Sequence, residues 1–358
     1  MTVQRTLAFA AVVPLALALA CTRANDSLGG TGGNGGSGGV GGGTDVDGGG
    51  NRGGGGNGGG GGDNGDLGTG GGVDGGPITP SSCSGKMSQP RDSAWTLSVG
   101  GTNRTVEVHV PATYDATKPT AFIINFHGYT SNGMQQAAVS NMSAKADSAN
   151  FVVAYPEGTG SPTGFNAGAC CGDAATNMVD DIGLTRAIIT EANSRLCLDG
   201  KRVFVTGFSN GGFMSHRIAC ELSDLVAAIA PVSGVLGIPA ASCMPKRAVS
   251  LMDFHGMSDN TVPYNGDPQS GWPSVPDTIA AWAKRDACTD TTPTQTYNKG
   301  DVTCATYSHC AAGAEVTLCT VSDGGHAWPG SPIALPGTTQ NISATDAMWT
   351  FFQAHPLP

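Results

Sequence analysis

The chain has 358 residues and a formal net charge of −10, and only 13% of its residues are charged. Because it is acidic and lacks a basic patch, we expect no nucleic-acid partner. After the first 20 residues no apolar run is long enough to span a bilayer, so any membrane contact is expected at the N-terminus alone.

The N-terminus has the pattern of an export signal. In residues 1–20 a basic residue, Arg5, precedes an apolar run that ends before Cys21, as in a cleaved signal peptide. Ala-Leu-Ala at positions 18–20 suits ordinary secretion, whereas Leu-Ala-Cys at positions 19–21 resembles a bacterial lipobox, in which Cys21 is lipidated. Both alternatives predict an extracellular or outer-surface protein, and the second adds a lipid anchor at Cys21.

Residues 21–82 form a glycine-rich tether in this interpretation. Its centre, residues 29–76, is mostly glycine interrupted by small polar and acidic residues. Such a composition cannot bury apolar surface and predicts disorder. The remaining residues, 83–358, suit one large catalytic α/β domain, which we expect to be monomeric.

Strands and helices are expected to alternate along residues 83–358. A hairpin over residues 94–111, with Gly100 and Gly101 in its turn, precedes this alternation. Strands are expected at 121–126, 151–156, 203–206, 226–232, 249–254 and 315–321, and helices at 135–149, 179–196, 212–220, 276–285 and 344–352. This order predicts an α/β fold with a doubly wound, mostly parallel sheet and helices on both faces. Ligands then bind beyond the carboxyl ends of the strands.

The segment Gly-Phe-Ser-Asn-Gly at positions 207–211 lies between an expected strand and an expected helix. In that context it matches the nucleophile elbow, in which a sharp turn holds the serine above the sheet. Gly207 and Gly211 supply the small residues that the turn needs. We therefore predict that Ser209 is a nucleophile rather than a helix cap.

A serine nucleophile needs a base and an acid that orients the base, and in this architecture they follow in the order serine, acid, histidine. The loop 254–264 follows a strand, and we assign its Asp259 as the acid. Two alternatives are Asp253, which falls within the strand, and Asp267, which lies further along the chain.

His326 is assigned as the general base, because it follows the strand at 315–321 and two glycines that let it reach over the sheet. The other histidines are expected at other positions: His109 on a solvated strand face, His127 and His255 in turns, His216 in the elbow helix, His309 between two cysteines and His355 in the tail.

The tetrahedral intermediate of ester hydrolysis needs two backbone N–H donors. We expect one from Asn210, which follows the nucleophile, and one from Tyr129 in the His-Gly-Tyr-Thr loop. Trp272, Trp328 and Thr130 are candidate substrate contacts, although core packing is an equally good role for the two tryptophans.

Cysteine number fits an exported protein. Of 11 cysteines, Cys21 stands apart and ten lie from Cys83 onward, an even set that suits full disulfide pairing. No paired C-x-x-C spacing is present, so we expect no metal site and no cofactor. We expect these bridges: Cys220 with Cys243, Cys197 with Cys170 or Cys171, Cys83 with the other of these two, and two among Cys288, Cys304, Cys310 and Cys319.

Several motifs together resemble one family. They are Gly-Phe-Ser-Asn-Gly-Gly, the His-Gly loop, Ala-Cys-Cys-Gly followed by Val-Asp-Asp, His-Gly-x-x-Asp and Gly-Gly-His-x-Trp-Pro-Gly. Residues 83–358 resemble the exported polyhydroxybutyrate depolymerase-like esterases, a group that includes feruloyl and acetylxylan esterases. The resemblance implies an α/β-hydrolase fold with Ser209, Asp259 and His326 as the catalytic triad.

The function expected from these features is a serine esterase that acts through an acyl-enzyme. Feruloyl or acetyl esters of plant cell-wall polysaccharides are the favoured substrates, and polyhydroxybutyrate or short hydroxyalkanoate esters are the alternative. A peptidase on the same fold is disfavoured, because no propeller or cap domain is apparent. The alternative outside the enzymes is a carbohydrate-binding module with a relic site, against which the presence of all three triad residues argues.

Overall fold

The computed structural model describes residues 83–358, so the expected signal peptide, the tether and Cys21 lie outside the described residues. Within this range ten strands form one sheet in the order β1-β2-β4-β3-β5-β6-β7-β10-β9-β8. The central strands from β4 to β10 are parallel, and an antiparallel pair flanks them at each edge. The strands are β1 (Asp92–Val99), β2 (Thr102–His109), β3 (Thr120–Phe126), β4 (Val152–Pro156), β5 (Leu198–Phe208), β6 (Ala228–Val232), β7 (Ser250–Gly256), β8 (Thr294–Lys299), β9 (Val302–Tyr307) and β10 (Val316–Val321).

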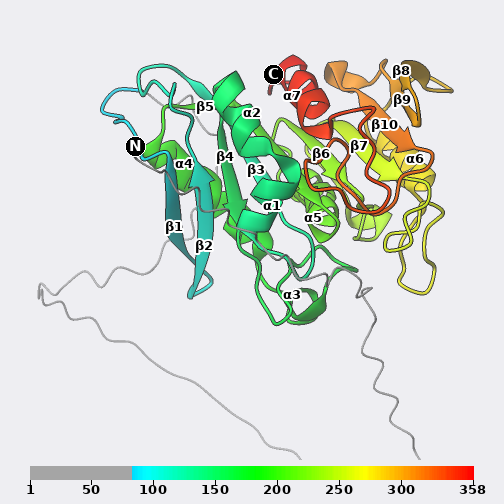
Figure 1. The fold of residues 1–358 in the computed structure, drawn as a ribbon, viewed down its shortest axis with the longest axis horizontal. Coiled ribbons are helices and arrows are strands. Elements are labelled where there is room, and N and C mark those ends of the chain that lie inside the picture. The colour runs from blue at the N-terminus through cyan, green and yellow to red at the C-terminus, as the bar shows by residue number, and fades with distance from the viewer. Residues whose placement is uncertain (1–82) are drawn as a thin grey trace, which may run out of the picture. The chain divides into compact units, whose positions relative to one another are not determined.

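Helices cover both faces of the sheet (Figure 1). One face packs against α4, α5 and α6, and the other against α1, α2 and α7. The helices are α1 (Gly133–Ser140), α2 (Met142–Ala149), α3 (Gly172–Thr176), α4 (Asp181–Arg195), α5 (Asn210–Glu221), α6 (Val275–Arg285) and α7 (Ala344–Ala354). The expected α/β class with a mostly parallel sheet and helices on both faces is therefore confirmed.

The central strands are buried on both faces, as their continuous apolar sequences require. Every residue of β3 and of β6 is buried. Aromatic pairs join the helical layer to the sheet: Phe204 of β5 stacks on Phe352 of α7, with ring centroids 4.6 Å apart. This double-sided core fixes the carboxyl ends of the strands, from which the loops of the candidate site extend.

Three local expectations differ from the structure. The helix expected over 135–149 is two helices, because Asn141 adopts a left-handed conformation with φ of 51°. The hairpin of β8 and β9 was not expected, since β8 is almost wholly exposed and carries no apolar alternation. His109 does not lie on a solvated face; it is buried, and its ring nitrogens contact Asp92 at 2.7 Å and Asp147 at 3.2 Å.

Five disulfides pair all ten cysteines of residues 83–358. Bridges join Cys83 to Cys197, Cys170 to Cys171, Cys220 to Cys243, Cys288 to Cys310, and Cys304 to Cys319. The expected Cys220–Cys243 bridge and the two bridges among the last four cysteines are confirmed.

The expected pairing of Cys197 with Cys170 or Cys171, and of Cys83 with the other, is wrong. Cys197 precedes β5 at its amino end, whereas Cys170 contacts Asn210 just past the carboxyl end of the same strand. An 11-residue strand separates the two positions. The N-terminal segment reaches Cys197 instead, because Lys86 Nζ donates to carbonyl groups at the end of α4.

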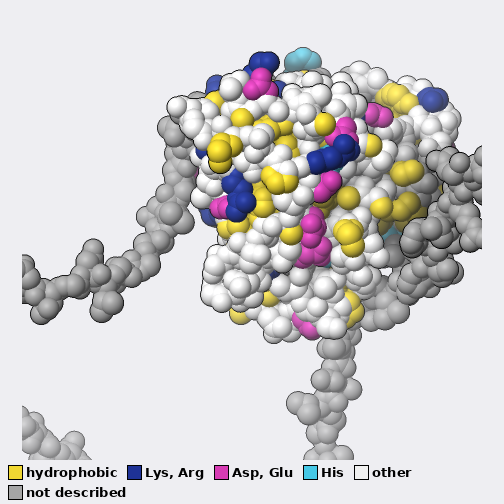
Figure 2. Space-filling model, turned by 60° about the vertical axis from the view of Figure 1, so that its left-hand side comes forward, with side chains coloured by type: hydrophobic (Ala, Val, Ile, Leu, Met, Phe, Trp, Pro, Cys, Tyr) yellow, Lys and Arg dark blue, Asp and Glu magenta, His cyan; other side chains and the backbone are white. Residues whose placement is uncertain are grey.

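On the face shown in Figure 2, lysine and arginine side chains are interspersed with acidic ones and do not form a basic patch. Among residues 83–358 no helix has the length and apolar character that crossing a bilayer requires.

Candidate active site

Ser209 lies at the sharp turn between β5 and α5, with φ of 55° and ψ of −117°. Such backbone strain in a residue other than glycine is typical of functional turns. The turn is possible only because its neighbours lack side chains. A Cβ at Gly207 would collide with the backbone of Gly211, and one at Gly211 would collide with the Phe126 carbonyl. The serine is therefore held at the carboxyl edge of the sheet.

The loops after β7 and β10 bring Asp259 and His326 together. The two strands are parallel neighbours, and Gly256 pairs with Val321 at their ends. Beyond them, Ser258 N–H donates to the Gly324 carbonyl at 2.9 Å. In consequence His326 Nδ1 lies 2.7 Å from Asp259 Oδ2.

Asp259 is buried, and each of its carboxylate oxygens has partners. Oδ1 accepts N–H hydrogen bonds from Thr261 and Val262, both at 2.8 Å, and Oδ2 faces His326. Burial raises the pKa of the Asp259 carboxyl, but the hydrogen bond and charge of His326, aided by His255 and the Val262 N–H, lower the pKa below its ordinary value. The carboxylate is thus kept ionised beside the imidazole.

His255 also contributes to this arrangement, beyond the turn role expected from sequence. Its side chain is buried. Its Nε2 donates to the Val262 carbonyl at 2.9 Å and lies 3.6 Å from Asp259 Oδ2. The imidazole therefore closes the loop that holds the carboxylate. Its position within His-Gly-x-x-Asp was a signal that could have revealed this contact.

The other candidate acids lie elsewhere. Asp253 is fully buried within β7 and faces His216 of α5 at 3.3 Å. Asp267 accepts a hydrogen bond from Ser270 in its own loop. Neither contacts His326, so the structure brings only Asp259 of the three to that histidine.

The His326 ring lies against Phe208, the residue before Ser209, with ring centroids 4.8 Å apart. Because Asp259 accepts from Nδ1, neutral His326 presents Nε2 as a proton acceptor. Both Ser209 and His326 are partly exposed to solvent. A hydroxyl, a base and an ionised acid are thus gathered at one accessible edge.

The loop after β3 passes beside the serine. A Cβ at Gly128 would lie 3.4 Å from the Ser209 Cβ, so this glycine permits close approach. Tyr129 follows it, and Asn210 begins α5, where first-turn N–H groups have no partner within the helix. Thr130 is exposed and its N–H donates to the Thr163 carbonyl at 2.8 Å.

His127 fixes the conformation of this loop. Its Nδ1 donates to the Gly128 carbonyl at 2.7 Å, and its Nε2 accepts from Gly158 N–H at 2.9 Å. Burial lowers the pKa of His127 to about 4, so the ring is neutral at pH 7. It is a structural turn residue, as expected from the sequence.

The two candidate tryptophans differ. Trp328 is 1% exposed, and its Nε1 donates to Thr345 Oγ1 at 3.0 Å within the core under α7. It therefore packs the core and does not line a cleft, which corrects its assignment as a substrate contact. Trp272 contacts Phe213 of α5 and lines a pocket whose other walls are loop residues and the first turns of α6.

The elbow, the paired Asp259 and His326 and the ten-stranded sheet define an α/β-hydrolase. Residues 110–269, which include Ser209 and Asp259, match the family described as Phospholipase/Carboxylesterase. An acetyl xylan esterase from Aspergillus awamori has a similar fold, with a TM-score of 0.54 and 17% identity over 73% of this chain and 99% of the other.

Among curated sequences, feruloyl esterase B of Piromyces equi is 34% identical over 236 residues, or 63% of this chain and 42% of that protein. A probable feruloyl esterase C of Aspergillus oryzae is 28% identical over 253 residues, or 68% and 82% of the two chains. This chain thus spans less than half of the Piromyces protein. The fold is that of an α/β-hydrolase, and the family match over residues 110–269 and the similarity to feruloyl esterases agree with the resemblance expected from the sequence motifs.

Proposed function

We propose that this protein is a serine carboxylic ester hydrolase that acts on feruloyl or acetyl esters of plant cell-wall polysaccharides. The observation that carries the proposal is the 2.7 Å contact of His326 Nδ1 with the buried Asp259, at the loop edge where Ser209 turns into α5. The similarity to feruloyl esterases supports the choice of ester.

In the proposed reaction Ser209 Oγ attacks the ester carbonyl carbon while His326 Nε2 takes the hydroxyl proton. Negative charge on the carbonyl oxygen is stabilised by the backbone N–H groups of Asn210 and Tyr129. His326 then protonates the departing alcohol, which leaves an acyl group on Ser209. A water molecule, activated by the same imidazole, releases the acid and restores the serine.

The test is hydrolysis of methyl ferulate, p-nitrophenyl acetate and a 3-hydroxybutyrate ester by the full chain. We expect the first two to be hydrolysed, and Ser209→Ala to lower kcat by about 10⁶-fold. Ser194→Ala is the matched control, because this exposed hydroxyl at the end of α4 bonds only to the Glu191 carbonyl among the described residues.

Two outcomes separate the alternatives. Release of 3-hydroxybutyrate without release of ferulate would favour the polyester alternative. Binding of polysaccharide with no turnover of any ester would favour a binding module with a relic site. Near-normal turnover in Ser209→Ala would remove the serine from the mechanism.

We further infer that residues 1–20 direct export and that residues 21–82 tether a monomeric catalytic domain to the cell surface through a lipid on Cys21. The five disulfides support export, because such bridges persist in oxidising compartments. Labelled palmitate supplied to expressing cells tests the anchor. Labelling that persists in Cys21→Ala, or is absent from the unchanged chain, refutes lipidation there, and light scattering of the purified protein tests the monomer.

A further inference from the structure

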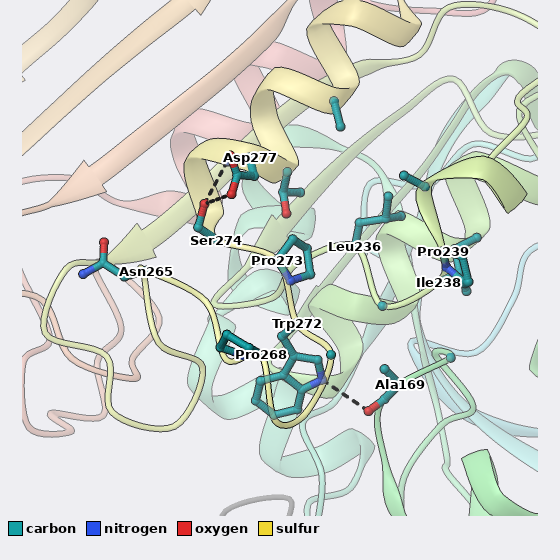
Figure 3. Close-up of a pocket in the computed structure, with 16 residues that line it drawn as sticks. Ala169, Leu236, Ile238, Pro239, Asn265, Pro268, Trp272, Pro273, Ser274 and Asp277 are labelled. Carbon is teal, nitrogen blue, oxygen red and sulfur yellow. Dashed lines mark hydrogen bonds between the residues drawn. The ribbon is translucent and has the colours of Figure 1, made fainter.

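A pocket of about 780 Å³ is lined by residues of three loops and of α6 (Figure 3). Three loops build it, each starting at the carboxyl end of a strand: the loop after β4, the loop after β6 and the loop after β7, which leads into α6. Ala169, Leu236 and Trp272 represent the three loops in its wall. The pocket therefore opens at the sheet edge where α/β folds bind ligands.

The three loops are tied together at one residue. Ala169 N–H donates to the Gly237 carbonyl at 2.7 Å, and the Ala169 carbonyl accepts from Trp272 Nε1 at 3.2 Å. Figure 3 shows the indole nitrogen directed at this carbonyl. Because these hydrogen bonds link all three walls, the pocket is formed before any ligand enters.

The pocket is connected to the elbow through the loop after β4 and does not contain the candidate catalytic residues. Ser209, Asp259 and His326 are absent from its lining. Its wall residue Ala169 is followed by Cys170, whose sulfur lies 3.5 Å from Asn210 Nδ2. A group bound there is accordingly remote from the reacting carbonyl but can belong to the same substrate.

The chemistry of the lining selects the ligand class. The walls are mainly apolar and include the buried Trp272 ring, whereas Asn265 and Asp277 of the lining are exposed. Among the described residues that line the pocket there is no lysine or arginine, and Asp277 is the one charged side chain. Apolar surface suits the C–H face of a sugar ring, and carboxylate and amide groups suit its hydroxyls. A negatively charged ligand would be repelled by Asp277.

We propose that this pocket binds a neutral sugar residue of the polysaccharide chain that carries the ester. The inference rests on the proposed ester hydrolysis, for which it names the part of the substrate that is recognised away from the carbonyl. Binding energy gained from such a remote group can be used to position the reacting bond.

The test fills the pocket from α6. Ala281 lines it, whereas its neighbour Ala280 is exposed on the same helix outside the lining, so Ala281→Trp and Ala280→Trp form a matched pair. The measurement is kcat/KM on a feruloylated arabinoxylan oligosaccharide divided by kcat/KM on methyl ferulate. We expect this ratio to fall about tenfold in Ala281→Trp, a loss of about 1.4 kcal/mol, and to stay unchanged in Ala280→Trp.

Ala240→Trp fills the pocket from the loop after β6 and should lower the ratio in the same way, which covers failure of the first variant to fold. Equal ratios in the pocket-filling variants and in Ala280→Trp would overturn the proposal.

Direct binding separates this inference from the proposed function. Full-length Ser209→Ala is titrated calorimetrically with ester-free arabinoxylan oligosaccharide and with oligogalacturonate, which is anionic. We expect the neutral oligosaccharide to bind to Ser209→Ala and the added Ala281→Trp substitution to abolish this binding, even if no ester is turned over by the unchanged enzyme. Absent binding of the neutral oligosaccharide, or equal binding of the anionic one, would refute the sugar assignment, whereas loss of all ester turnover would refute only the proposed hydrolysis.

Discussion

Asn210 exchanges two hydrogen bonds with the main chain of Phe165. Its Oδ1 accepts from Phe165 N–H at 2.7 Å, and its Nδ2 donates to the Phe165 carbonyl at 3.0 Å. Phe165 in turn packs edge-on against Phe126, at 5.0 Å, and against His127, at 4.6 Å between ring centroids. The first residue of the elbow helix is thus locked to the loop after β4 and, through it, to the loop that carries Tyr129.

Asn210→Ala should therefore impair both stability and catalysis. It leaves the buried Phe165 N–H without its partner, whereas the Phe165 carbonyl keeps the hydrogen bond that it accepts from Cys171 N–H, so the change should cost about 1–3 kcal/mol of unfolding free energy. It also frees the backbone whose N–H is proposed to stabilise the oxyanion, so kcat should fall by about 10²-fold. Urea unfolding and ester kinetics measure the two effects.

Asn298→Ala is the control for this change, because Asn298 is exposed on β8. It should leave both measurements close to those of the unchanged chain. If Asn210→Ala behaved like Asn298→Ala, the bonds to Phe165 would have no role in holding the site.

Asp259→Asn should keep the fold but lower kcat by about 10⁴-fold, the effect that this substitution has in a serine protease triad. An amide nitrogen facing His326 Nδ1 would favour the wrong tautomer, and Nε2 would no longer be free to accept the serine proton. Ester kinetics with a circular dichroism spectrum of each variant check the prediction.

Asp267→Asn provides the comparison, since Asp267 bonds to Ser270 and does not contact His326. Its kcat should stay within about twofold of the unchanged chain, as for a residue outside the catalytic contacts. A large loss in Asp267→Asn together with a small one in Asp259→Asn would reverse the assignment of the acid.

Local sequence rules predicted the elements that carry the site. The continuous apolar strands indicated a buried sheet, and Gly207 and Gly211 indicated the sharp turn at Ser209. Both could be predicted because these signals depend only on residues that are neighbours in the sequence. The position of Asp259 relative to His326 was also predictable, since parallel strands end at the same edge of the sheet. Asp253 could be set aside because it falls within a strand.

Contacts between distant segments were beyond such rules. The bonds between Asn210 and Phe165 join residues 45 positions apart, and nothing in either local sequence specifies them. Cys83 could not be paired because its partner depends on the path of the N-terminal segment along α4. His109 was wrongly predicted on a solvated strand face for the same reason, because its ring is contacted by Asp147 of α2 and not by another residue of β2.

A buried ion pair provides a test of stability away from the serine. Arg104 Nη2 lies 2.8 Å from Asp181 Oδ1, and both side chains are almost completely buried. Arg104→Met should lower the unfolding free energy by about 3–5 kcal/mol, because it leaves the Asp181 carboxylate without its counter-charge. Lys246→Met, which breaks the exposed pair with Asp224, should cost at most about 1 kcal/mol. Urea unfolding measures both variants. Similar losses of unfolding free energy would show that burial does not determine how much an ion pair contributes to stability.

The pH dependence of stability should report on His127. Its pKa in the folded protein is about 4, below the ordinary value of 6.5, because burial disfavours the charged ring. Between these values the unfolded chain binds the proton more readily than the folded one. The stability associated with a neutral His127 is therefore complete above pH 6.5 and is lost as the pH falls towards 4, by about 3 kcal/mol in total. His127→Gln removes the titrating group, so its unfolding free energy should fall less steeply over this range. Urea unfolding between pH 4 and 8 measures both curves, and parallel curves for the two proteins would show that this imidazole does not govern the acid limit of stability.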